Sequence, residues 1–176
     1  TVLNTTTPEN GTLRNSMLPT LLTFAYENRQ FAPSFGIFEA GRVIDGITAE
    51  NTANARRRLG VVLFDKQLSE KELYFKAVEI IKYIALEIRH SSVSFTRIET
   101  KHNWEHPRNT SKICVNGSEI GTLCTLHPSV AAKIDKRAAI IGIEIDLDLL
   151  SEVEALALGY KEPSKFPGVD FDLSLV

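Results

Sequence analysis

The stretch LRNSMLPTLL, residues 13–22, is followed at residues 35–43 by FGIFEAGRV, and the rest of the chain is arranged around these two segments. A short helix is predicted from residue 18 onward, because apolar residues recur there at spacings of three and four: Leu18, Leu21, Leu22, Ala25 and Tyr26. Pro19 suits the first turn of that helix, where its missing N–H is no loss. The second segment is apolar and rich in β-formers, which predicts a buried strand that leads into a turn at Asp45-Gly46.

Beyond these segments, strands outnumber helices. Strands are predicted at residues 59–64, 93–98, 112–115, 118–123 and 139–147. Helices are predicted at residues 70–89, 128–134 and 148–158, and the first begins with a capping box at Ser69 and Glu72. The dipeptide Asn116-Gly117 is a strong signal for a hairpin. Strands in hairpin-like succession predict an α+β fold, in which helices flank a mainly antiparallel sheet.

The composition is that of an ordinary globular domain. The 176 residues include 43% apolar and 24% charged side chains, without a run of about 18 apolar residues that would predict a membrane span. The net charge of −2 gives no overall positive field, so any RNA contact must be local or made by other subunits. The chain opens on Thr1 without a signal-peptide pattern, and we expect a fragment of a longer cytoplasmic protein.

Two cysteines, Cys114 and Cys124, are too few for a disulfide framework, which favours a reducing compartment. Because they lie on the two strands of the predicted hairpin, they could be neighbours, and we expect two buried thiols. A zinc site would need these cysteines and the histidines at 102, 106 and 127. No CxxC pair supports such a site, and we predict no metal site.

A family resemblance is carried by LRNSMLPTLL and FEAGRV, separated by one helix. Further matching segments follow in order: His106-Pro107, residues 116–123, Leu126-His127-Pro128, residues 143–147 and residues 164–167. Together they resemble the phenylalanyl-tRNA synthetase β-subunit family, in the module that is related to the catalytic cores of class II synthetases but has lost activity. Because the matches run over nearly the whole chain, chance is a poor explanation for them.

The resemblance implies a class II core-like fold and a structural role. Residues 1–160 would form the core-like module, with its N-terminal part missing, and residues 161–176 a linker and the start of a further domain. In this family an α2β2 heterotetramer carries catalysis on the α-subunit, and the β-module packs against it. The implied partners are therefore the α-subunit and, indirectly, tRNA. ATP and magnesium would belong to the parent enzyme and not to this chain.

Two arginines that class II synthetases use to bind ATP are missing from the matching segments. A fixed guanidinium neutralises the triphosphate and the charge that develops at the α-phosphorus. After Gly41-Arg42-Val43, active relatives continue with an aromatic residue and an arginine, whereas this chain has Ile44-Asp45-Gly46. The second counterpart, residues 141–150, contains three acids and no arginine. This pattern predicts that the chain has no catalytic and no cofactor-binding residues. Two alternative functions stay open: an active ATP-dependent ligase or adenylating domain, and an RNA-binding module.

A few charged and aromatic residues remain as candidate sites. Arg14, Glu39 and Arg42 could contact a partner subunit or form an internal salt bridge, and the sequence leaves both open. Trp104 lies among basic residues and could stack on a nucleotide, although a packing role is commoner for a half-buried tryptophan. The basic run at residues 56–58 could contact RNA phosphates, but we expect it to be a solvated strand entrance.

Overall fold

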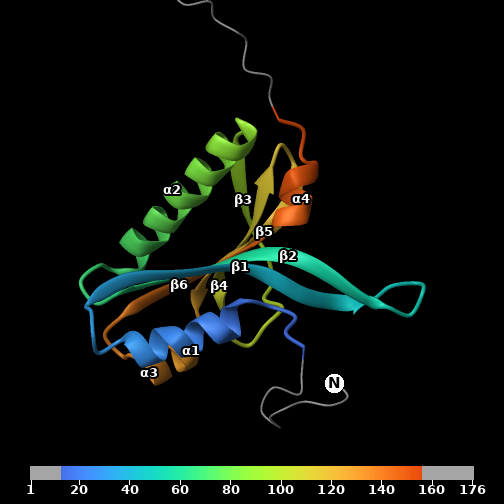
Figure 1. The fold of residues 1–176 in the computed structure, drawn as a ribbon. Coiled ribbons are helices and arrows are strands. Elements are labelled where there is room, and N and C mark those ends of the chain that lie inside the picture. Colours follow the sequence, from blue (N-terminus) through green and yellow to red (C-terminus); the bar gives the residue numbers. More distant parts are fainter. Residues whose placement is uncertain (1–12, 156–176) are drawn as a thin grey trace, which may run out of the picture.

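A six-stranded antiparallel sheet forms the centre of the computed structural model, which describes residues 13–155 (Figure 1). The strands are β1 (Ser34–Ile47), β2 (Ala53–Asp65), β3 (Val93–Arg97), β4 (Glu105–Val115), β5 (Ser118–Leu126) and β6 (Ala139–Asp146), in the order β1-β2-β6-β5-β4-β3. The helices are α1 (Leu18–Asn28), α2 (Glu70–Arg89), α3 (Pro128–Ile134) and α4 (Leu147–Glu152). The predicted α+β fold with a mainly antiparallel sheet is confirmed.

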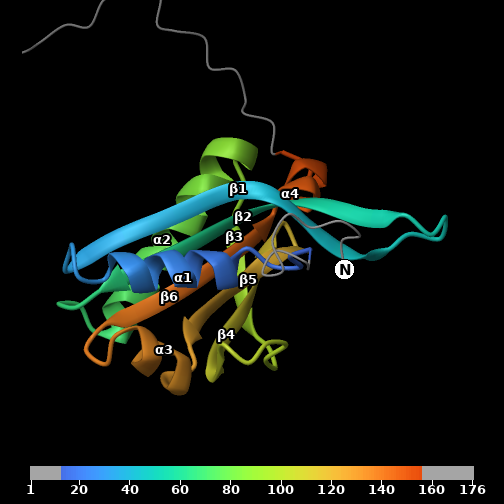
Figure 2. The same cartoon turned by 60° about the horizontal axis from the view of Figure 1, so that its bottom comes forward.

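The helices cover both faces of the sheet, and a separate apolar core lies on each side (Figures 1 and 2). On the side of α1 and α3, Met17, Leu21 and Phe64 are among the buried side chains. On the side of α2 and α4, Ile81 and Ile143 are among them. Successive strand residues point to opposite faces, so β2 and β6 supply apolar side chains to both cores.

Helix α2 begins and ends as its sequence predicts. The Ser69 side chain accepts a hydrogen bond from the Glu72 N–H, and the Glu72 carboxylate accepts one from the Ser69 N–H at 2.8 Å. This reciprocal pair satisfies donors that a helix start would otherwise leave free. At the other end His90 adopts a left-handed conformation with φ of 50°, and its N–H donates to the Leu86 carbonyl.

The two His-Pro dipeptides stabilise local turns. His127 precedes α3, and its Nδ1 accepts a hydrogen bond from the Ser129 N–H at 3.2 Å, so the imidazole serves as a helix cap. The Nδ1 of His106 accepts from the Arg108 N–H at 3.0 Å inside an irregular stretch of β4. Residues 13–155 contain no group of three or more His, Cys, Asp and Glu side chains that could hold a metal ion.

The first strand differs from its prediction in length and burial. Asp45-Gly46 lies inside β1 at a bulge between Ile44 and Ile47, where Gly46 has φ of +83°, and the chain reverses at residues 48–52 instead. The prediction of a turn at this dipeptide was therefore wrong. The prediction of a buried strand was also wrong, because β1 is an edge strand whose alternate residues are exposed.

The last helix is shorter than predicted. Helix α4 ends at Glu152, and Val153 is already extended, whereas the apolar pattern predicted a helix up to residue 158. The expected boundary at residue 160, the linker and the start of a further domain lie outside the described residues. No helix within residues 13–155 is both long and apolar enough to cross a membrane.

The two cysteines are buried and free, but they are not neighbours across the hairpin. Cys124 lies opposite Thr110, while Cys114 lies opposite Glu119 on β5 and Ser94 on β3. The two-residue turn at Asn116-Gly117 sets Cys114 opposite Glu119, five residues before Cys124 along β5, so the two thiols are not paired. Burial raises the pKa of the Cys124 thiol to about 12, which keeps it protonated.

Candidate functional site

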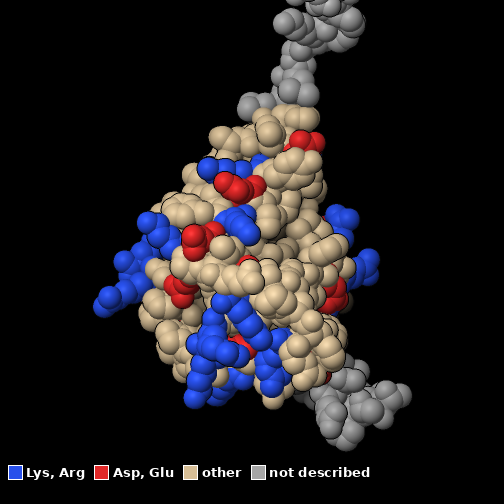
Figure 3. Space-filling view, turned by 90° about the vertical axis from the view of Figure 1, so that its left-hand side faces the viewer, with Lys and Arg blue, Asp and Glu red and all other residues tan. Residues whose placement is uncertain are grey.

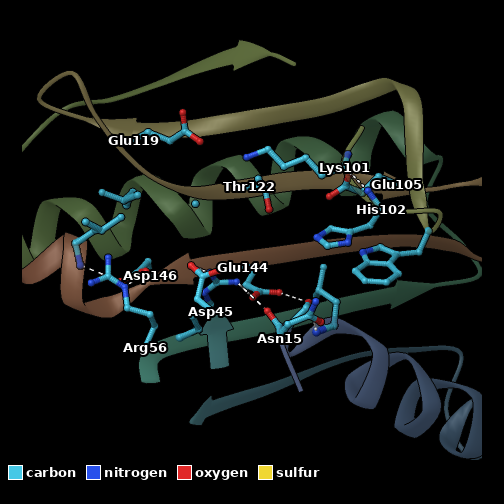
Figure 4. Close-up of a pocket in the computed structure, with 17 residues that line it drawn as sticks. Asn15, Asp45, Arg56, Lys101, His102, Glu105, Glu119, Thr122, Glu144 and Asp146 are labelled. Atoms are coloured by element: carbon cyan, nitrogen blue, oxygen red, sulfur yellow. Dashed lines mark hydrogen bonds and ion pairs between the residues drawn. The ribbon is translucent and has the colours of Figure 1, made fainter. Parts of the chain in front are cut away.

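A polar cleft of about 490 Å³ opens on the α1 face of the sheet (Figure 4). Its sides come from β2 and β6, from β5, from residues 15 and 16 just before α1, and from the loop between β3 and β4. Five acidic side chains line it, Asp45, Glu105, Glu119, Glu144 and Asp146, together with the three basic side chains Arg56, Arg58 and Lys101. The lining is thus more acidic than basic.

Three consecutive arginines of β2 pair with three alternate acids at the end of β6 and the start of α4. Arg58 Nη1 lies 2.8 Å from Glu144 Oε1, and Arg56 Nε lies 3.2 Å from Asp146 Oδ2. Arg57 points to the opposite face, where its Nε lies 2.7 Å from Asp148 Oδ1. The alternation follows from the strand, because neighbouring residues point to opposite faces.

Arg58 and Glu144 form the centre of the cleft. A second contact of Arg58, from Nη2 to Asp45 Oδ2, measures 3.1 Å, so its guanidinium lies between two carboxylates. The other Glu144 oxygen accepts hydrogen bonds from the Ser16 hydroxyl and from the Met17 N–H. Glu144 therefore joins β6 both to β2 and to the start of α1.

The other end of the cleft is aromatic. His102 and Trp104 stack with ring centroids 4.2 Å apart and planes 6° apart, and Figure 4 shows His102 at this end of the cleft. Trp104 Nε1 is buried and has no hydrogen-bond partner among the described residues. The Glu105 carboxylate accepts hydrogen bonds from the N–H groups of Lys101 and His102, which fixes the loop that carries the rings.

Comparisons with known proteins identify the family. The family described as the phenylalanyl tRNA synthetase beta chain CLM domain matches residues 1–147. This chain belongs to that family. The phenylalanine–tRNA ligase beta subunit of Bacillus subtilis is 30% identical over 96% of the chain, that of Aquifex aeolicus 27% over 99%, and that of Clostridium acetobutylicum 28% over 94%. The chain spans about a fifth of the length of these relatives, 20–22%.

In this CLM domain, Arg14 and Glu39 form an ion pair, and Arg42 joins them through its backbone. The guanidinium of Arg14 lies 2.7 Å and 3.1 Å from the two Glu39 oxygens, and its Nε donates to the Arg42 carbonyl at 3.1 Å. Gly41 makes room for this arrangement, since a Cβ there would lie 2.5 Å from Arg14 Nη2. The Arg42 side chain is exposed and has no ion pair among residues 13–155.

The basic run at residues 56–58 of the CLM domain differs from its prediction. Arg56 and Arg58 are not a solvated strand entrance, because their side chains are only 28% and 20% exposed and face the cleft. The sequence does contain a pattern that could have predicted these ion pairs. Three arginines precede one apolar strand, and three acids occur at every second position from residue 144 to residue 148. Opposite charges at strand spacing indicate pairing between strands.

Chemically, the cleft of the CLM domain is a polar site with more carboxylates than cations, in which both arginines are already paired. Both arginines form ion pairs with carboxylates. Some of these carboxylates also accept backbone hydrogen bonds: Asp146 Oδ1 accepts one from the Leu149 N–H at 2.9 Å and so caps α4. Trp104 lies at the edge of this cleft, as the prediction of a nucleotide-stacking site would require, but its neighbour His102 already covers one ring face.

Proposed function

We propose that this CLM domain is a non-catalytic structural and subunit-contact module of a phenylalanine–tRNA ligase β chain. It would have a class II synthetase core-like fold and support tRNA aminoacylation in the cytoplasm. The observation that carries the proposal is the position of Arg58 between Glu144 and Asp45. ATP and magnesium would then act elsewhere in the parent enzyme.

The charge of the cleft opposes ATP binding. By the resemblance, the β1–β2 hairpin and the β6–α4 segment correspond to the two ATP-binding motifs of class II synthetases. A triphosphate needs guanidinium groups that are free to bind it. Here both cleft arginines already have carboxylate partners, and a triphosphate would also meet Glu119 and Glu105. The negative charges of these carboxylates and of the triphosphate would repel one another, which opposes ATP binding.

Calorimetry tests the absence of an ATP site. Titration of the purified chain with magnesium–ATP to millimolar concentration should give only the heat of dilution. A complex that contains the α-subunit, measured in the same buffer, provides the positive control. A saturable heat of one ATP per chain would contradict the proposal.

The exposed face of β1 is our candidate for contact with the α-subunit. Phe38 is 74% exposed on this edge strand, and Arg42 lies four residues further on the same face. Aromatic residues and arginine are enriched at protein interfaces, where one ring can bury 150–250 Å². Arg14 and Glu39 would support this strand from its other side.

Co-purification tests this contact. A tagged α-subunit should capture the wild-type chain, and the double variant F38E/R42E should lower capture at least about tenfold, since it places two carboxylates in an apolar and cationic contact. The variant K71E/K82E, which changes two exposed positions of α2, is the matched control and should be captured like the wild type. Failure of the wild-type chain to bind, or equal capture of F38E/R42E, would contradict the assignment.

A further inference from the structure

Five basic side chains gather at the end of the sheet that lies away from the cleft. We call this group the basic patch; it consists of Arg29, Lys66, Lys133, Lys136 and Arg137. Figure 3 views the molecule from this end, and Lys and Arg side chains cover much of the lower part of the view, with little acidic surface among them. Along β2, Arg58 and Asp65 are seven residues apart, about 23 Å at strand spacing, so the patch is a separate site.

Contacts between three chain segments hold the patch together. Lys66 Nζ donates to the Arg29 carbonyl at 2.8 Å and lies 3.1 Å from Asp135 Oδ2. Asp135 Oδ1 accepts a hydrogen bond from the Arg137 N–H at 2.9 Å, and this bond lowers the pKa of the carboxyl. The Asp135 carboxylate therefore neutralises Lys66.

The other cations of the patch remain available. Lys133, Lys136 and Arg137 are exposed, and no carboxylate pairs with them within residues 13–155. Three such charges close together repel one another unless an anion binds. A chain of net charge −2 thus carries a concentrated positive surface at one place.

Aromatic side chains lie on the segment that carries Arg29. Phe31 stands between Arg29 and Pro33, whose carbonyls both accept hydrogen bonds from Lys66. Phe31 follows α1 and is 76% exposed, and Tyr26 is 46% exposed. The Arg29 guanidinium lies 3.7 Å from the centre of the Tyr26 ring. A solvent-exposed ring next to unpaired cations is the combination on which unstacked bases bind, with phosphates on the basic groups.

We propose that the basic patch binds a single-stranded segment of RNA, with its phosphates on Lys133, Lys136 and Arg137 and a base stacked on Phe31. An acidic protein surface, the competing ligand, would satisfy mainly the charges, whereas a base and its phosphate together engage both the exposed ring and the cations. The inference goes beyond the scaffold function and does not rest on it, because it concerns another face of the molecule.

Salt-dependent binding tests the phosphate contacts. We would measure fluorescence anisotropy of a labelled 12-nucleotide single-stranded RNA of mixed sequence with the purified chain at several salt concentrations. The variant K133Q/K136Q/R137Q should bind at least about tenfold more weakly at low salt, and the slope of log K against log salt should fall by about 2, for three phosphate contacts at roughly 0.7 each. The control K71Q/K76Q/K82Q removes three exposed charges from α2 and should keep the wild-type slope.

A second variant separates RNA from an acidic protein as the ligand. F31A should weaken binding at least about fivefold with an unchanged salt slope, since stacking on a ring involves no released counterion. Polyglutamate should compete poorly with the RNA. The proposal is overturned if the patch variant binds like the control variant, or if F31A has no effect while polyglutamate competes as well as RNA. These assays use the chain without an α-subunit, so their failure is distinct from failure of the scaffold function.

Discussion

Glu144 is the residue on which most of the cleft depends. Its carboxylate is buried and serves Arg58, the Ser16 hydroxyl and the Met17 N–H. We predict that Glu144→Ala lowers the free energy of unfolding by about 3 kcal/mol, because it leaves Arg58 without its buried partner and two donors unsatisfied. Chemical denaturation measures this change.

Asp45 provides the matched control for Glu144. It contacts the same guanidinium, but its side chain is 58% exposed. Asp45→Asn should therefore cost less than about 1 kcal/mol, as is usual for exposed ion pairs. Equal losses for the two variants would mean that burial of Glu144 is unimportant.

Asp148 gives a prediction for pH. The Arg57 N–H donates to this carboxylate at 2.8 Å, and that hydrogen bond lowers the pKa of Asp148. A carboxyl whose pKa is lower in the folded state adds stability above its unfolded pKa, about 3.9, and loses that contribution as the pH falls through the folded value. Asp148→Asn should lower the melting temperature at pH 7, and the difference from wild type should vanish in strong acid. Thermal unfolding followed between pH 2 and pH 7 measures it, and a constant difference would contradict the assignment.

Individual side chains of the site were harder to predict than their charges. By the family resemblance, acids stand where ATP-binding arginines were expected, and the structure puts Asp45, Glu144 and Asp146 in one cleft. The sequence did not predict that Arg56 and Arg58 line the same cleft, because the pairing of β2 with β6 joins residues some 90 positions apart. Long-range register is a property of the folded sheet and not of a local pattern.

Among the elements, α1 approaches β2 unusually closely, and Gly60 makes this possible. A Cβ at residue 60 would lie 2.5 Å from Met17 Cβ and 2.8 Å from Leu21 Cδ1. We predict that Gly60→Ala displaces α1 and costs at least about 2 kcal/mol of unfolding free energy, which denaturant titration measures.

Gly36 serves as the control for Gly60. It lies on the edge strand β1, and its added Cβ would meet only the flexible end of Leu63 at 3.2 Å. Gly36→Ala should therefore change stability by less than about 1 kcal/mol. A loss as large as that of Gly60→Ala would show that strand burial, and not the approach of α1, sets the cost.

Elements with a strong local signal were predicted well. The capping box gave the start of α2, Asn116-Gly117 gave the β4–β5 hairpin, and Pro128 gave the start of α3. Asp45-Gly46 was misleading because the same dipeptide can form a bulge within a strand, and the ladder to β2 continues past it. The edge position of β1 had no local signal.

At the scale of the whole molecule, the sheet should open from one side. β2, β6, β5 and β4 have a hydrogen-bonded neighbour on each side, while β1 and β3 are the edges, and the β1–β2 hairpin projects beyond the rest of the sheet (Figure 2). We predict that amide hydrogen exchange is slowest in β6 and fastest, within the sheet, near residues 44–55, because fewer contacts protect this end. Equal protection of the hairpin end and β6 would contradict this ranking.

The alternating ion pairs between β2 and β6 have a consequence for how the chain finds its alignment during folding. The middle of β2, Leu59-Gly60-Val61-Val62-Leu63, is apolar on both sides, so burial alone would tolerate a slip of one residue. Such a slip would turn Arg56 and Arg58 away from Asp146 and Glu144, and Arg57 away from Asp148, so that all three cations would lose their counterparts at once. These paired charges, together with Gly60 under α1, therefore select a single register of β2 against β6.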